Sequence, residues 1–307
     1  MLISRRNFCS GLAAAGAAYF ANPLSVSTRA ADPPASNRLR VISYNILACT
    51  GWPADRTLAR RAVERKQIPR RIALELALYD PHVVTFSESP GEELTKEIAK
   101  LLGMQHVRFP SGEDWPGTLL SKFEVVESQN APYAAAAGAK READLFTRHW
   151  GRATLKLPSG ERLVVHSAHL YPGPDSAIRL REIDVMLAAM RPDLAAGRPM
   201  LLMGDLNHRP FPPEYPKWQA AGWVDTFAAV NQGDIKRDAS AAGNPEGLTF
   251  SAERPKVRID YVWAAGPLAK QIKASRPLWV GAFRTNPDDK ESFALSDHVP
   301  QFAEFEL

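Results

Sequence analysis

Six segments of this chain that we expect to form β-strands end in, or begin at, a side chain that can bind a metal or move a proton. These polar positions are Asn45, Glu88, His169, Asp205 with Asn207, Asp260, and Asp297 with His298. One such position alone would indicate only a turn, because Asp and Asn commonly follow strands in turns. Strand ends on one rim of a sheet meet in space, so side chains from distant parts of the sequence can line one pocket there. The recurrence therefore predicts sheets that carry a polar site at one rim.

The hydrophobic pattern predicts strands interspersed with helices. Strands are expected at residues 39–45, 82–86, 118–126 (as a strand pair), 152–157, 162–170, 200–203, 259–263 and 299–305. Helices are expected at 72–78, 94–102 and 175–190. Pro158-Ser159-Gly160 joins its two neighbouring strands into a hairpin. Hairpins require antiparallel pairing, so the predicted fold class is α+β rather than a doubly wound parallel sheet.

The N-terminus resembles a twin-arginine export signal. Arg5 and Arg6 precede a weakly apolar, alanine-rich stretch at 11–20, and small residues before and at Ala30 suit cleavage after that residue. The stretch is too short to span a bilayer stably. An ordinary N-terminal helix with two arginines is the alternative.

This interpretation sets the expected domain organisation and location. We expect a signal peptide at 1–30, a linker at 31–38 and one catalytic domain at 39–307. The twin-arginine translocation machinery would then be a partner, and the protein would be exported, either to the periplasm or to the medium. No transmembrane segment is expected in the mature chain.

The charge balance argues against a nucleic-acid surface spread over the whole domain. The chain has 38 Lys and Arg against 34 Asp and Glu, but three of the arginines lie in the expected signal, which has no acid. The mature net charge therefore gives no support for nucleic acid as a partner. A local basic face stays open, because residues 56–71 hold seven Lys and Arg against Glu64 alone. This run is either a phosphate-facing strip or a solvated helix face.

The ordered motifs resemble those of the endonuclease/exonuclease/phosphatase family, from about residue 39 to the end of the chain. They are Ile42-Ser43-Tyr44-Asn45, Ser87-Glu88, Ser167-Ala168-His169-Leu170, Met203-Gly204-Asp205-Leu206-Asn207, Arg258-Ile259-Asp260-Tyr261-Val262 and Ser296-Asp297-His298-Val299-Pro300. Ser87 departs from the pattern, since many members carry Gln before the glutamate. The resemblance implies a four-layer α/β/β/α sandwich with its active site at the sheet rim, and a metal-dependent hydrolase of phosphate esters.

The resemblance also implies a role for each polar residue. Mg²⁺, with Mn²⁺ as the alternative, would be bound by Glu88, with Asn45 and Asp297 contributing directly or through water. Asp205 would orient or deprotonate a water molecule, and Asn207 would hold the phosphate. His298 would bond a phosphate oxygen or act as acid and base. Asp260 is expected to orient an imidazole, that of His169, which would serve as general acid or as a transition-state donor.

The substrate is less defined than the reaction. A phosphodiester is expected, and the alternatives are an extracellular nuclease, a sphingomyelinase-like phospholipase C and a phosphomonoesterase. Arg148, Arg152 and Trp115 are the candidate substrate-binding residues, although each could also be an ordinary surface or packing residue. An alternative of another class is a catalytically silent binding protein on the same fold.

Overall fold

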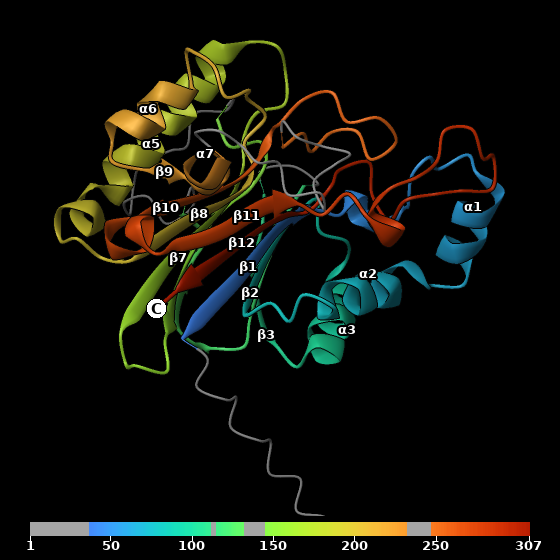
Figure 1. Ribbon diagram of the computed structural model, residues 1–307, viewed down its shortest axis with the longest axis horizontal. Helices are drawn as coiled ribbons and strands as arrows, with labels where there is room; N and C mark the ends of the chain where they lie inside the picture. The colour runs from blue at the N-terminus through green and yellow to red at the C-terminus, as the bar shows by residue number, and fades with distance from the viewer. Residues whose placement is uncertain (1–36, 112–114, 132–144, 232–246) are drawn as a thin grey trace, which may run out of the picture. The chain divides into compact units, whose positions relative to one another are not determined.

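The computed structural model of the protein describes residues 37–111, 115–131, 145–231 and 247–307. Its strands form two six-stranded sheets (Figure 1). The first sheet has the order β11-β12-β1-β2-β4-β3, with β1 at Arg38–Asn45, β2 at Val83–Ser87, β3 at Gln105–Phe109, β4 at Gly117–Ser121, β11 at Ile272–Pro277 and β12 at Gln301–Glu306. The second has the order β5-β6-β7-β8-β10-β9, with β5 at Glu124–Gln129, β6 at Trp150–Lys156, β7 at Arg162–His169, β8 at Met200–Asp205, β9 at Val224–Asp225 and β10 at Asp260–Ala265.

Each sheet contains one parallel pair among antiparallel ones. In the first sheet β1 runs parallel to β2, and in the second β7 runs parallel to β8. The remaining neighbours are antiparallel, including the predicted hairpin of β6 and β7, in which Lys156 lies opposite Arg162. The α+β prediction is confirmed.

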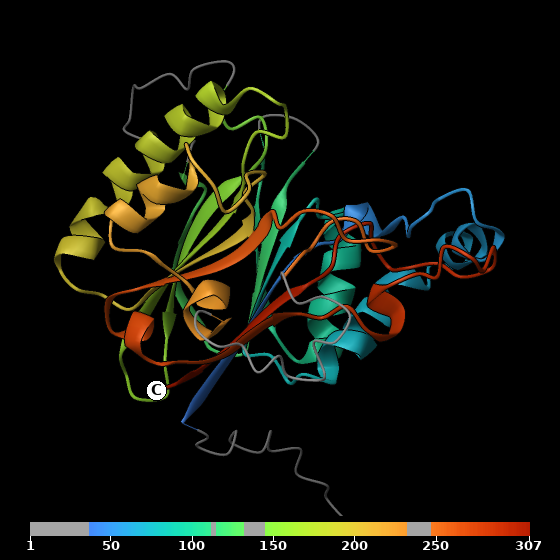
Figure 2. The ribbon, with the colours of Figure 1, turned by 45° about the horizontal axis from the view of Figure 1, so that its top comes forward.

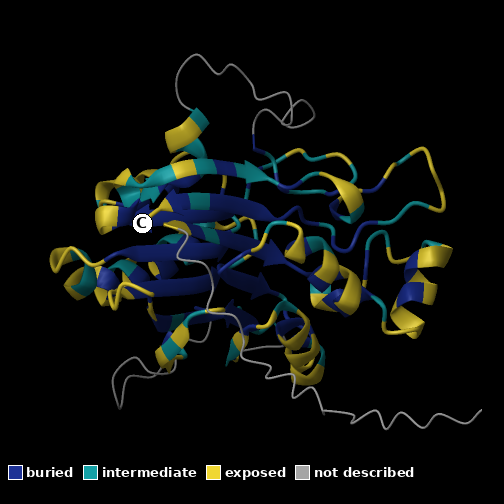
Figure 3. Ribbon diagram, turned by 60° about the horizontal axis from the view of Figure 1, so that its bottom comes forward, coloured by how far each residue is buried: buried dark blue, intermediate teal, exposed yellow. Residues whose placement is uncertain are grey.

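Helices cover the outer face of each sheet, and the two inner faces pack on each other. Figure 2 shows α2 (Ile68–Ala77) and α3 (Glu92–Leu102) in teal on one side, and α5 (Ser176–Ala195) in yellow-green with α6 (Tyr215–Ala220) in orange on the other. Apolar side chains from both sheets, Val41 and Val83 with Leu155 and Val165 among them, fill the space between the sheets. The central strands are accordingly buried along most of their length, whereas the strands β3, β5 and β11 are largely half-buried or exposed and the helices expose their outer faces (Figure 3). The predicted four-layer α/β/β/α sandwich is confirmed.

The shorter elements lie around these layers. In the part of the chain that the structure describes they are α1 at Thr57–Glu64, α7 at Thr226–Asn231, and the 3-10 turns η1 at Leu47–Cys49, η3 at Gly266–Lys270 and η4 at Gly281–Phe283. Within the described segments, no helix combines the length and the apolar character that crossing a bilayer would need.

The expected strand pair at 118–126 is wrong. The segment contains β4 and the start of β5, but β4 pairs with β2 and β3 in the first sheet, while β5 pairs with β6 in the second. The backbone of Phe123 and the hydroxyl of Ser121 bond each other in the crossing between the sheets. The predicted signal at 1–30 and most of the linker at 31–38 lie outside the described residues.

Candidate active site

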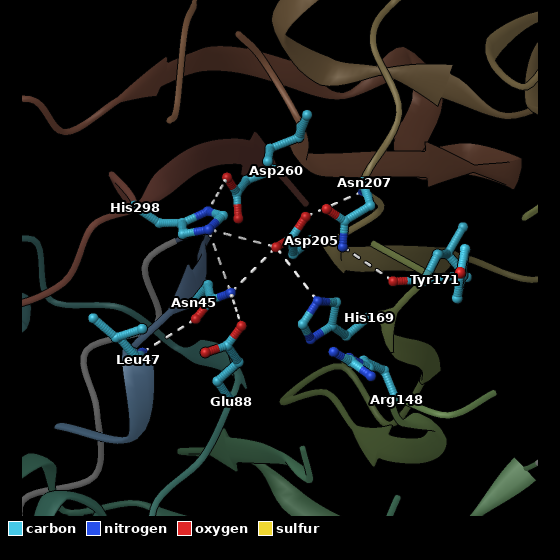
Figure 4. A network of polar contacts seen from close by, with 12 residues as sticks. Asn45, Leu47, Glu88, Arg148, His169, Tyr171, Asp205, Asn207, Asp260 and His298 are labelled. Atoms are coloured by element: carbon cyan, nitrogen blue, oxygen red, sulfur yellow. Dashed lines mark hydrogen bonds and ion pairs between the residues drawn. The ribbon is translucent and has the colours of Figure 1, made fainter. Parts of the chain in front are cut away.

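The strand directions bring the polar positions together at one rim (Figure 4). The parallel pairs place Asn45 at the end of β1 and Glu88 just after β2, and likewise His169 and Asp205 at the ends of β7 and β8. Because β10 runs antiparallel to β8, its first residue, Asp260, lies opposite Asp205 in the register. Residues from both sheets therefore share one site.

Asp205 lies at the centre of this group. Its Oδ2 accepts a hydrogen bond from Asn45 Nδ2 at 3.2 Å and lies 3.6 Å from His169 Nε2 and 3.7 Å from His298 Nε2. Its Oδ1 accepts from the backbone N–H of Asn207 at 3.1 Å. The Asp205 side chain is only 2% exposed, so these contacts rather than water set its orientation.

Asp260 orients His298, and the expected pairing of Asp260 with His169 is wrong. His298 Nδ1 donates to Asp260 Oδ2 at 2.9 Å, which turns Nε2 of the same ring towards Asp205 and Asn45. The Phe250 ring packs beside the imidazole, with centroids 5.0 Å apart. The sequence could not distinguish the two histidines, because both immediately adjoin a predicted strand.

The two site histidines have opposite electrostatic environments. Burial alone would lower the pKa of His298, but the carboxylates of Asp260 and Asp205 raise it to about 10. Burial lowers the pKa of His169 well below its ordinary value, and the nearby His149 and Arg148 act in the same direction. Near neutral pH, His298 is thus cationic and His169 is neutral. A neutral His169 suits a hydrogen-bond donor better than a general acid.

Glu88 and its neighbours have the chemistry of a hard-cation site. Glu88 Oε2 is buried without a hydrogen-bond partner, while Oε1 accepts from Asn45 Nδ2 at 3.1 Å. Burial raises the pKa of Glu88, and the nearby Asp297 carboxylate raises it further. A buried carboxylate oxygen without a partner, beside a second carboxylate, fits Mg²⁺ or a similar ion, which takes oxygen ligands.

Asn45 contacts these carboxylates through its nitrogen. Its Oδ1 accepts from the backbone N–H of Leu47 at 3.1 Å, which leaves Nδ2 for Glu88 and Asp205. Asn45 is therefore a hydrogen-bond donor that holds the two acids in place. A second group with ligand-type atoms, Asp205, Asp260 and His298, has these atoms within 4.8 Å of one another. Part of that closeness is the hydrogen bond between His298 and Asp260.

Backbone geometry at the strand ends depends on one glycine. Gly204 has a φ of +153°, and a Cβ there would lie 1.7 Å from the carbonyl oxygen of Ala168. Only glycine allows β8 to approach β7 so closely directly before Asp205. Glu88 and Asn207, both with φ of +50°, also adopt the left-handed region that non-glycine residues avoid. Such strain is typical of functional positions.

The other expected substrate-binding residues divide into two groups. Arg148 lies beside His169 in Figure 4, and its guanidinium packs over the ring of Trp115, 5.0 Å from the centroid. Burial raises the pKa of Glu88, and the positive charge of Arg148 partly opposes this rise, so that charge acts on the carboxylates of the site. The structure therefore places Arg148 and Trp115 next to the site.

Arg152 lies elsewhere, so its expected contact with substrate is wrong. Its guanidinium forms ion pairs with Glu127 and with Asp193 of α5, on the outer face of the second sheet. Side chains alternate between the faces of a strand. Arg152 is thereby turned to the helix-covered face and neutralised there.

Two supporting residues were not among the predicted site residues. His149 bonds Ser167 Oγ at 2.9 Å and packs edge-on against the ring of His169, with centroids 6.4 Å apart. Glu182 of α5 is fully buried and accepts from the backbone N–H groups of Phe146 and Tyr171, at 2.7 and 2.9 Å. Phe146 lies in the segment that carries Arg148, and Tyr171 lies in the segment that follows His169, so Glu182 holds both segments in place. The only sequence signal for Glu182 was its place within the helix predicted at 175–190.

Comparisons with known proteins agree with this geometry. The sequence profile of the endonuclease/exonuclease/phosphatase family matches residues 42–298. No curated protein matches the chain in sequence at a significant level.

Solved structures are similar in fold. Truncated TDP2 from Caenorhabditis elegans has a TM-score of 0.61 at 17% identity, over 88% of this chain and 98% of that one. TDP2 from D. rerio in complex with a single-strand DNA product has a TM-score of 0.60 at 17% identity, over 88% and 99%. An endonuclease/exonuclease/phosphatase family protein from Bacteroides thetaiotaomicron has a TM-score of 0.60 at 17% identity, over 88% and 98%. At these identities the likeness concerns the fold. Because the family profile covers most of the chain, the protein belongs to the endonuclease/exonuclease/phosphatase family and is a metal-dependent phosphoester hydrolase.

Proposed function

We propose that the protein is a phosphodiesterase that uses Mg²⁺, bound by Glu88 and Asp297. The observation that carries the proposal is the contact of Asp205 with three donors, Asn45, His169 and His298, directly beside the unpartnered Glu88 oxygen. A divalent cation at this place supplies charge neutralisation to a phosphate oxygen. Mn²⁺ is the alternative ion.

The residues of the chain then divide the remaining work. His298, held as a cation by Asp260, donates from Nε2 to a phosphate oxygen and stabilises the charge that develops there. Asp205 orients the attacking water and accepts its proton. His169 stays neutral and donates a hydrogen bond in the transition state.

Asn207 and Arg148 bind the phosphate from the sides. One hydrogen of Asn207 Nδ2 is used by Leu170 O at 3.0 Å, so the second is left for a phosphate oxygen. Arg148, packed over Trp115, supplies a further positive charge next to His169.

Metal-dependent turnover is the direct test. The purified protein, stripped of metal, is assayed on bis(p-nitrophenyl) phosphate and on the monoester p-nitrophenyl phosphate, with and without Mg²⁺ or Mn²⁺. We expect diester hydrolysis that needs the ion and is lost in His298→Ala, but kept in His106→Ala, a matched control on β3 outside the site. Turnover of the monoester alone would overturn the phosphodiesterase proposal in favour of a phosphomonoesterase.

The natural substrate calls for a panel. Single-stranded DNA, sphingomyelin and small soluble diesters represent the nuclease, phospholipase C and general phosphodiesterase alternatives. DNA enters the panel because the D. rerio TDP2 structure contains a single-strand DNA product. A nuclease that contacts many phosphates should lose activity steeply as salt rises, whereas an enzyme for small diesters should not.

We also propose that the protein is exported by the twin-arginine translocation machinery. Support comes from Arg5 and Arg6 before the apolar stretch and from the small residues before Ala31. Expression in a bacterial host with and without that machinery should give an exported product beginning at Ala31 only when it is present. Replacing Arg5 and Arg6 by Lys should abolish export, and export that survives this change would overturn the proposal.

A further inference from the structure

A basic surface outside the active site covers α1 and the beginning of α2. Its cations are Arg60, Arg61, Arg65, Lys66 and Arg70, and we call the region the α1–α2 surface. All five are exposed, and within the described residues none of their side chains has a hydrogen bond or ion pair. By contrast, Arg56 pairs with Glu253 and Arg71 packs over the ring of Phe293.

Exposed leucines lie on the same two helices, and we include them in the α1–α2 surface. Arg70, Leu74 and Leu78 are spaced four residues apart along α2 and its cap, so they form one row on the outer face of the helix. Leu74 is 59% exposed and Leu78 is 76% exposed, and on α1 Leu58 is 40% exposed next to the arginines. The opposite faces of the helices are already packed in the core, through Ala59 and Ala62 on α1 and through Ile72 and Leu76 on α2. The leucines therefore take no large part in the packing of the core.

The combination of free cations and exposed leucines distinguishes two kinds of anionic partner. The phosphates of a nucleic acid bind cations, but exposed leucines beside the phosphate backbone add no favourable contact. The interface of an anionic bilayer takes both, because headgroups attract the cations and the acyl boundary accepts the apolar side chains. The surface also has the access that such docking needs, since α1 stands clear of both sheets (Figure 1).

We propose that the α1–α2 surface docks the protein on an anionic lipid bilayer. The cations contact the headgroups, and Leu74 and Leu78 enter the interface. This docking goes beyond the proposed phosphodiesterase activity and does not depend on it, because no residue of the surface belongs to the active site.

Vesicle binding by the full chain tests the proposal. Co-sedimentation is measured with vesicles of phosphatidylcholine alone and with vesicles that also contain phosphatidylglycerol. The triple variant Arg60→Gln, Arg61→Gln, Arg65→Gln should bind the phosphatidylglycerol vesicles on the order of 100-fold more weakly than the unchanged chain. The control triple Lys156→Gln, Arg162→Gln, Lys273→Gln removes the same charge from exposed positions on β6, β7 and β11, and should bind within a few-fold of the unchanged chain.

The leucines separate the two partners. Leu74→Gln with Leu78→Gln should weaken vesicle binding, while any binding to a single-stranded oligonucleotide stays unchanged. If the two charge triples weaken vesicle binding equally, the surface has no special role and the proposal is overturned. If the leucine variant binds vesicles normally while the arginine triple loses oligonucleotide binding, the surface serves nucleic acid and the membrane proposal is also wrong. Melting temperatures of all variants show that each is folded.

Discussion

His298 and Asp260 form a hydrogen-bonded pair across the two sheets of the sandwich. Asp260 is the first residue of β10 in the second sheet, whereas His298 precedes β12 of the first, and their bond is 2.9 Å long. Asn45 of β1 and Asp205 of β8 make a second such contact at 3.2 Å. The site is therefore assembled by the packing of the sheets on each other. Neither sheet contains it alone.

Replacing Asp260 by Asn should reduce kcat by about 100-fold to 10,000-fold. The substitution keeps the shape but removes the charge that holds His298 as a cation, and it leaves intact the backbone bond from Asp260 N–H to Thr249 Oγ1. Steady-state kinetics on a chromogenic diester measures the effect, and a melting curve checks the fold. A kcat within a few-fold of the unchanged enzyme would show that the pair is structural.

Replacing Gly204 by Ala should cost about 3 kcal/mol of unfolding free energy or more, because the added Cβ would collide with the carbonyl oxygen of Ala168. Gly160→Ala is the matched control. It also has a positive φ, of +87°, but a Cβ there meets nothing within 4 Å, so only backbone strain of about 1–2 kcal/mol remains. Urea unfolding of both variants gives the comparison. Equal losses would show that the close approach of β7 and β8 adds nothing beyond strain.

The sequence was informative wherever a motif coincides with a strand end. Because polar side chains recur at predicted strand ends, the sequence alone could place one set of positions on one rim: Asn45, Glu88, His169, Asp205 with Asn207, Asp260, and Asp297 with His298. The partner of Asp260 could not be predicted in this way. His169 and His298 both lie beside the boundary of a predicted strand, and only the packing of the two sheets brings His298 Nδ1 within 2.9 Å of Asp260.

Other features had no local signal at all. β3 and β11 contain few apolar residues and are strands because they pair along β4 and β12. Arg148 and Arg152 lie only four residues apart, and nothing in the sequence separates their roles. The alternation of side chains along β6 turns Arg152 towards α5, where it forms an ion pair with Asp193. Tertiary pairing, rather than propensity, determined these positions.

Glu182 should make the stability of the protein depend on pH. Burial raises the pKa of Glu182 from 4.5 to about 7, although the backbone N–H groups of Tyr171 and Phe146 and the charge of Arg179 oppose this. Arg148 opposes it as well. The folded state therefore holds the proton more tightly than the unfolded state. The stabilisation is complete below pH 4.5 and is lost as the pH rises through 7.

The variant Glu182→Gln has no such proton, so it isolates this contribution from other titrating groups. Between pH 4.5 and 8 the unfolding free energy of the unchanged protein should fall by about 2–3 kcal/mol relative to that of the variant. Denaturant unfolding of both proteins across this range measures the difference. Parallel pH curves would mean that Glu182 stays ionised in the folded protein.

Adding Mg²⁺ to the metal-free protein should raise its unfolding free energy, by about 2.7 kcal/mol at an ion concentration of 100 times Kd. A cation there gives the unpartnered Oε2 of Glu88 a partner and relieves the repulsion between Glu88 and Asp297. Glu88→Gln and Asp297→Asn should each abolish most of the increase, because each removes a charged oxygen ligand. Asp260→Asn should retain it, since that residue bonds His298 instead. Thermal melts with and without Mg²⁺ on all four proteins decide between the two groups of acids. An increase lost in Asp260→Asn but kept in Glu88→Gln would move the ion to Asp205, Asp260 and His298.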